Sequence, residues 1–174
     1  NVIGNTLFDK NLILSKIKSK TKKITNVIAN NNFKLFQLNN DLIRIKNFYK
    51  SQGYRDVNVE YAVEYFSNNQ VEINFIINEG QQYFISKINM QNNLDTNEDL
   101  DNKILSFINN SQNNVNNIYY SKRLDEIEYS IVEILENAGK QYFKINVYEK
   151  IDNNNADILF EISPETPVSI SSKI

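Results

Sequence analysis

The chain has 174 residues, a formal net charge of −2 at pH 7 and a pI near 5.3, and 41% of its residues are apolar. This composition is typical of a globular protein, and the acidic balance argues against a nucleic-acid-binding surface, which normally needs a strongly basic face. Cysteine and histidine are absent from the sequence, which excludes disulfides, thiolate nucleophiles and the usual zinc sites. The sequence also lacks an apolar run of the roughly 18–20 residues that a membrane-spanning helix needs.

The first patterned segment is predicted to begin with a strand end that turns at Gly4. A short helix should follow, with Asp9 near its start, because apolar residues recur at helical spacing (Phe8, Leu12, Ile13 and Ile17). The Lys- and Asn-rich stretch 18–32 indicates a loop or a frayed helix end. A second helix is predicted over about 40–52, ending at Gly53 as a left-handed C-cap.

Two strands are expected after this glycine. The first covers about 55–66, and the turn formers of 67–70 close a hairpin. The returning strand carries Val71, Ile73, Phe75 and Ile77 on one face. Glu79-Gly80 is interpreted as a strand terminator that needs a positive φ at Gly80. This segment is therefore predicted to run strand, helix, helix, strand, strand.

The same pattern recurs later in the chain. Gly53 and Gly139 are 86 positions apart, and Phe75 and Phe160 are 85 apart. The positions 4, 5, 8 and 15 before each glycine are apolar in both copies (Tyr49, Phe48, Ile45 and Leu38; Leu135, Ile134, Ile131 and Leu124). The residue 12 positions before each glycine differs, since it is Asp41 in the first copy and Ile127 in the second. A period this regular predicts two copies of one module.

The second copy is expected to begin with a strand over 83–90 and a helix over about 97–108, followed by a loop over 109–117. A hairpin with its turn at 152–155 should end it. The predicted fold class is α+β, with two tandem βααββ modules, each a three-stranded mixed sheet covered on one face by two helices. Their expected bounds are 1–82 and 83–167. Residues 168–174 repeat the start of the first strand, so we expect a third copy and a native protein that extends in both directions.

No catalytic, cofactor or metal site is predicted. The acidic run 95–99 begins like a calcium loop, but Leu100 stands where the sharp turn needs glycine, and Ser106 where a bidentate carboxylate is needed. An acidic first turn of a helix explains the run better. The alternating lysines within 16–23 indicate a solvated stretch. Gly53, Tyr54, Gly80 and Gly139 are interpreted as structural residues.

These features resemble POTRA domains, the βααββ repeats on the periplasmic side of BamA-type outer-membrane assembly proteins. The resemblance rests on Ile3-Gly4-Asn5, Leu38-x-x-Asp41, Phe48-Tyr49-x-x-x-Gly53-Tyr54, Val57-x-Val59 and Ile77-Asn78-Glu79-Gly80-x-x-Tyr83-x-Ile85. The first copy is similar to the third such domain of the family and the second copy to the fourth. The second copy departs from the pattern at Asn92-Asn93, where Gly-Asn is usual, and at 163–165, where Glu-Gly would end the strand.

The resemblance implies the periplasmic part of an outer-membrane protein of a Gram-negative bacterium, with membrane contact only through a C-terminal barrel beyond this chain. The implied partners are accessory assembly lipoproteins and unfolded outer-membrane proteins, without nucleic acid, cofactor or enzymatic activity. The periplasmic arm of a TamA-like or two-partner secretion transporter is the alternative. An enzymatic function is not supported, because no cluster of titratable residues is evident. A nucleic-acid-binding KH-like module would need a GxxG loop and a basic face, and neither is visible.

Family topology leaves the second strand of each module at a sheet edge, where an extended segment can add as a further strand. The predicted partner-binding residues of this edge are Val57, Asn58, Val59, Glu60, Tyr61, Ala62 and Val63. The substitution Val59→Pro is expected to weaken such binding and to leave the fold intact.

Overall fold

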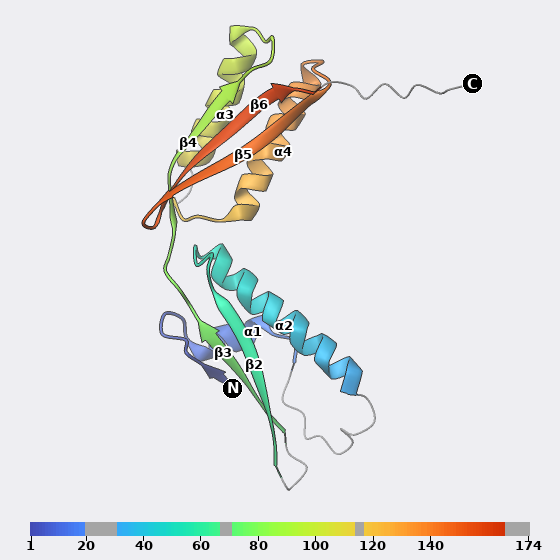
Figure 1. The fold of residues 1–174 in the computed structure, drawn as a ribbon, viewed down its shortest axis with the longest axis vertical. Coiled ribbons are helices and arrows are strands. Elements are labelled where there is room, and N and C mark those ends of the chain that lie inside the picture. Colours follow the sequence, from blue (N-terminus) through green and yellow to red (C-terminus); the bar gives the residue numbers. More distant parts are fainter. Residues whose placement is uncertain (20–30, 67–70, 114–116, 166–174) are drawn as a thin grey trace, which may run out of the picture. The chain divides into compact units, whose positions relative to one another are not determined.

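A computed structural model describes residues 1–19, 31–66, 71–113 and 117–165 (Figure 1). The chain divides into two compact units, Asn1–Gln82 and Tyr83–Ile174, and each has its own cluster of buried apolar residues. The hairpin loop expected at 67–70 and the third copy expected at 168–174 lie outside the described residues.

The first unit contains β1 (Val2–Ile3), α1 (Lys10–Lys16), α2 (Asn31–Ser51), β2 (Asn58–Tyr65) and β3 (Val71–Asn78). Its sheet has the order β1-β3-β2, with β1 parallel and β2 antiparallel to the central strand β3. The last strand of the unit is therefore central, and β2 lies at an edge.

The second unit repeats this topology. It contains β4 (Phe84–Asn92), α3 (Glu98–Asn113), α4 (Ser121–Asn137), β5 (Phe143–Asp152) and β6 (Asn155–Pro164). The order of its sheet is β4-β6-β5, again with a parallel and an antiparallel neighbour on either side of the central strand. The predicted α+β class and the mixed three-stranded sheets are thus confirmed.

Several helix boundaries differ from the predicted ones. The N-cap Asp9 is confirmed, since its side chain accepts hydrogen bonds from the backbone N–H groups of Asn11 and Leu12. However, α2 begins at Asn31 rather than near 40, and α3 continues to Asn113 rather than ending at 108. Both extensions are rich in Asn, whose low helix propensity is outweighed here because each helix also contains buried apolar residues, such as Leu38 and Ile108.

The two long helices that precede the hairpins end in the same way. Gly53 has φ +90° and Gly139 has φ +77°. The N–H of Tyr54 donates to the carbonyl of Tyr49 at 3.1 Å, and in the second unit the N–H of Lys140 reaches the corresponding carbonyl at 3.0 Å. This is the hydrogen bond of a Schellman motif, which satisfies the last carbonyls of a helix. The predicted C-cap role of Gly53 is confirmed, and Gly139 has the same role in the second unit.

A buried carboxylate joins the beginning of the first unit to its end. Glu79, which follows β3, is 7% exposed. It accepts hydrogen bonds from the N–H groups of Thr6 (3.0 Å) and Leu7 (3.2 Å) and from the hydroxyl of Tyr49 (2.8 Å). Gly80 follows with φ +69°, as predicted for the strand terminator.

A second buried carboxylate, Asp41 of α2, is fully buried. It accepts hydrogen bonds from the N–H groups of Lys18 and Ser19, each at 2.9 Å, and pairs with Arg44 at 2.6 Å. These contacts hold the segment that leaves α1 against α2. Asp41, the polar residue on the otherwise apolar helix face, therefore has a structural role.

Candidate binding edges

The predicted edge strand β2 is shorter than expected and mixes buried and exposed residues. It covers 58–65 instead of 55–66, so Val57 precedes the strand and does not belong to it. Val57 and Val59 are 6% and 1% exposed and belong to the core of the unit. Asn58 and Glu60 are exposed, whereas Tyr61, Ala62 and Val63 are half-buried.

The hydrogen bonds of β3 define which backbone groups of β2 point outward. The N–H of Phe75 donates to the carbonyl of Asn1 at 3.0 Å, and the amino group of Asn1 donates to the carbonyl of Ile73. These β3 residues therefore face β1, and the alternate ones face β2. The register of β2 against β3 then places the backbone groups of Asn58, Glu60, Ala62 and Glu64 toward β3. Those of Val59, Tyr61, Val63 and Tyr65 point away from the sheet.

The same argument applies to β5 in the second unit. The carbonyl of Ile162 accepts from the N–H of Asn93 on the β4 side, at 2.8 Å, and the N–H of Glu165 donates to the carbonyl of Tyr142 on the β5 side, at 2.6 Å. Odd-numbered residues of β6 therefore face β5. Their register partners are the even-numbered residues of β5, so Phe143, Ile145 and Val147 direct their backbone groups away from the sheet.

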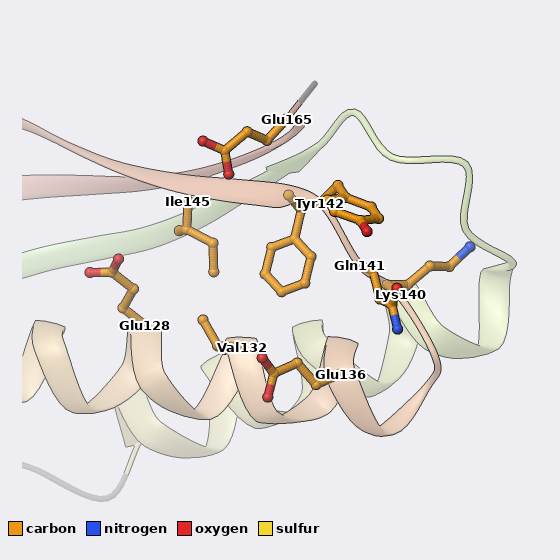
Figure 2. Close-up of a pocket in the computed structure, with 9 residues that line it drawn as sticks. Glu128, Val132, Glu136, Lys140, Gln141, Tyr142, Ile145 and Glu165 are labelled. Atoms are coloured by element: carbon orange, nitrogen blue, oxygen red, sulfur yellow. The ribbon is translucent and has the colours of Figure 1, made fainter. Parts of the chain in front are cut away.

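A groove of about 620 Å³ lies between β5 and α4 (Figure 2). Its apolar lining comes from three half-buried side chains, Val132 of α4 and Phe143 and Ile145 of β5. Its polar lining comes from Glu128, Glu136, Lys140, Gln141, Tyr142 and Glu165. Figure 2 shows Glu128 and Val132 on the side of the helix that faces the strand, and Ile145 directed back toward the helix. The outward backbone of β5 thus borders an apolar surface.

The equivalent strand residues of the first unit are packed much more tightly. Val57 and Val59 occupy the positions of Phe143 and Ile145 and are buried. Tyr54, which is 8% exposed, occupies the position of Lys140. Its ring lies edge-on to those of Phe8 and Tyr49, at centroid distances of 5.8 and 6.0 Å. This aromatic cluster fills space that the second unit leaves open.

Sequence reasoning missed the groove residues. The available signal was the comparison of the two copies, because Tyr54 is replaced by Lys140 and Leu42 by Glu128. Tyr142 carries a further signal that only the structure reveals. It has φ +57° and is 61% exposed. Bulky residues adopt this left-handed conformation rarely, and such strained residues concentrate at functional sites.

Across the described ranges, no group of three or more Asp or Glu side chains is arranged to hold a metal ion. Within the same part of the chain, every helix is too short or too polar to span a bilayer.

The first unit matches a known family profile. Residues 1–80 match the family profile described as POTRA, surface antigen variable number repeat. The match covers nearly the whole first unit. The chain is also 29% identical over 160 residues to the outer membrane protein assembly factor BamA of Buchnera aphidicola subsp. Acyrthosiphon pisum (strain APS). The match covers 90% of this chain, which spans about a quarter of the length of that relative.

Solved structures extend the POTRA fold to the second unit. The crystal structure of Haemophilus influenzae BamA POTRA3-5 matches with a TM-score of 0.60 and 16% identity, over 93% of this chain and 63% of that chain. BamA from Haemophilus ducreyi lacking POTRA domains 1–3 matches with a TM-score of 0.52 and 19% identity, over 86% and 28% of the two chains. Both units therefore have the POTRA fold. The assignment to the third and fourth POTRA domains stays a prediction.

Proposed function

We propose that the chain is a periplasmic interaction scaffold of an outer-membrane protein assembly factor. It binds extended segments of unfolded outer-membrane proteins and of accessory lipoproteins along the edges β2 and β5. The observation that carries the proposal is the outward direction of alternate backbone groups along both edge strands. An extended segment that adds to such an edge gains main-chain hydrogen bonds and needs little particular sequence. The similarity to BamA supports the cellular setting.

This scaffold role requires no chemistry from the chain. The two long helices and the central strand hold each edge in place, and the bound segment supplies the remaining hydrogen bonds. We therefore propose a binding function and not an enzymatic one. The role of the seven residues 57–63 in binding remains a proposal. Within this range, the outward backbone groups of Val59, Tyr61 and Val63 are the ones that would bind the segment.

The experiment uses proline to remove one outward donor from each edge. Val59→Pro is a poor choice because Val59 is 1% exposed and its loss would disturb the core. Val63 and Val147 are half-buried, and their N–H groups point away from the sheet. Proline is tolerated at such edge positions because no ladder hydrogen bond is lost.

Binding of a fluorescent peptide of about ten residues with alternating apolar and polar side chains would be measured by anisotropy. The matched controls are Val63→Ala and Val147→Ala, which shorten the same side chains and keep the N–H. We expect the proline variants to bind at least several-fold more weakly than the alanine variants, with unchanged circular dichroism. Equal affinities of the proline and alanine variants would contradict the proposal.

A further inference from the structure

We infer that the groove between α4 and β5 selects extended segments that carry Lys or Arg on both sides of an apolar residue. The first unit does not share this preference. This inference rests on the proposed function, because it specifies the segment that the β5 edge accepts.

The helical wall of the groove carries two carboxylates around an apolar centre. Glu128 and Glu136 flank Val132 on α4, and all three side chains line the groove (Figure 2). At the equivalent positions of α2, the first unit has Leu42, Lys46 and Lys50. The charge of the wall is therefore reversed between two units of the same fold.

These carboxylates are only partly neutralised, because the groove lining holds Lys140 beside Glu128, Glu136 and Glu165. The ammonium group of Lys140 donates to the backbone carbonyl of Asp95 instead of pairing with a glutamate. Among the described residues, neither Glu128 nor Glu136 takes part in an ion pair. Glu165 adds a third carboxylate to the lining. The groove thus presents a negative potential that a cationic side chain of a bound segment would complement.

The spacing of the wall matches that of an extended chain. Glu128 and Glu136 are eight positions apart, which corresponds to about 12 Å along a helix. In a strand, residues i and i+4 lie about 13 Å apart and point to the same side, with residue i+2 between them. A segment paired with β5 can therefore place basic side chains near both glutamates while an apolar side chain contacts Val132. The recognised pattern is basic-x-apolar-x-basic.

The apolar contact surface is already partly exposed for such a segment. Phe143 and Ile145 are half-buried, whereas Val57 and Val59 at the equivalent positions of the first unit are 6% and 1% exposed. In the second unit, an added strand would thus cover exposed apolar surface. In the first unit, the equivalent surface is already covered by the unit's own side chains. Both the charge and the available apolar area assign the preference to the second unit.

The test compares three labelled peptides that are identical except at two positions, with Lys-x-Val-x-Lys, Thr-x-Val-x-Thr or Glu-x-Val-x-Glu at the centre. Exposed pairs contribute modestly each, so the full chain should bind the Lys peptide about 3- to 10-fold more tightly than the Glu peptide in low salt. The difference should shrink as the salt concentration rises toward 1 M.

Two double variants identify the groove as the source of the preference. Glu128→Lys with Glu136→Lys should reverse the order of the Lys and Glu peptides. Glu126→Lys with Glu133→Lys makes the same change of net charge at exposed positions of α4 outside the groove and should keep the order. Circular dichroism checks that both variants are folded.

The possible outcomes distinguish the proposed edge-binding function from the inferred charge preference. If none of the three peptides binds to the wild-type chain, the proposed edge-binding function fails. If all three bind with equal affinity, edge binding stands and the inferred charge preference is overturned. If both double variants reverse the order equally, the net charge of the chain and not the groove decides, which also overturns the inference.

Discussion

The hydroxyl of Tyr49, in the last turns of α2, donates a 2.8 Å hydrogen bond to the carboxylate of Glu79 just after β3. The same carboxylate accepts from the backbone of Thr6 and Leu7 near the start of the chain. One buried side chain therefore connects the first strand's exit, the long helix and the end of the unit. Burial and the nearby negative charge of Glu79 raise the pKa of Tyr49, so its hydroxyl remains a donor at neutral pH.

Glu79→Gln should destabilise the first unit at neutral pH by about 2 kcal/mol, because hydrogen bonds to a charged acceptor are replaced by weaker ones. Hydrogen exchange of first-unit peptides, followed by mass spectrometry, measures this local loss. Glu64→Gln, at an exposed position of β2, is the matched control and should change little. Equal protection in the Glu79 and Glu64 variants would show that the buried network does not stabilise the unit.

The stability of the first unit should depend on acid pH through the same carboxylate. Burial alone would raise the pKa of Glu79, but hydrogen bonds from Thr6, Tyr49 and Leu7 outweigh it and lower the pKa below its ordinary value of 4.5. A lowered folded-state pKa gives stability that is fully present above about pH 4.5 and is lost as the pH falls through the folded-state value. The difference between wild type and Glu79→Gln should therefore shrink on acidification. A difference that stays constant from pH 7 to pH 3 would contradict this.

Asp41→Asn should loosen the junction between α1 and α2. The carboxylate accepts from the N–H groups of Lys18 and Ser19, and the amide can satisfy only one of them as acceptor. Leaving a buried donor without a partner costs about 1–3 kcal/mol. Thermal unfolding of the variant, compared with Asp125→Asn at an exposed position of α4, measures the effect. Similar melting temperatures for both variants would contradict the prediction.

Two glycines with similar backbone angles should respond differently to alanine. At Gly139, with φ +77°, an added Cβ would have no neighbour within 4 Å, so Gly139→Ala should cost only the roughly 1–2 kcal/mol of the left-handed conformation. At Gly4, with φ +86°, the Cβ would lie 2.2 Å from the carbonyl oxygen of Ile77, and the backbone must move. Chemical denaturation should show a clearly larger loss for Gly4→Ala. Equal losses would mean that the contact between Gly4 and Ile77 is easily relaxed.

The repeated pattern was sufficient to predict the elements and their order, because local signals fixed them. Gly53 and Gly139 ended helices as expected, and Asp9 began one. Contacts between residues far apart in the sequence could not be predicted. Glu79 was interpreted as part of a strand terminator, and Asp41 only as an exception on a helical face, since neither the Thr6 contact nor the Lys18 contact has a sequence signature.

The candidate site was predictable in its location and not in its detail. Alternation and topology indicated an edge strand, but they did not reveal that Val57 and Val59 are buried. Burial depends on whether Tyr54 fills the space beside the strand, and this is decided by packing against Phe8. The replacement of this tyrosine by Lys140 in the second copy was a sequence signal for a less filled space, but the groove itself and its lining residues come from the structure.

The connection between Thr6 and Glu79 has a consequence for how the first unit is made. The two residues are 73 positions apart, and β1 also finds its partner only in β3, near the end of the unit. A growing or translocating chain therefore cannot complete this unit until nearly all of it has emerged. Until then α1 and α2 have no finished sheet to cover, so the segment stays unfolded and exposes its apolar residues. A scaffold proposed to receive unfolded proteins would itself pass through that state.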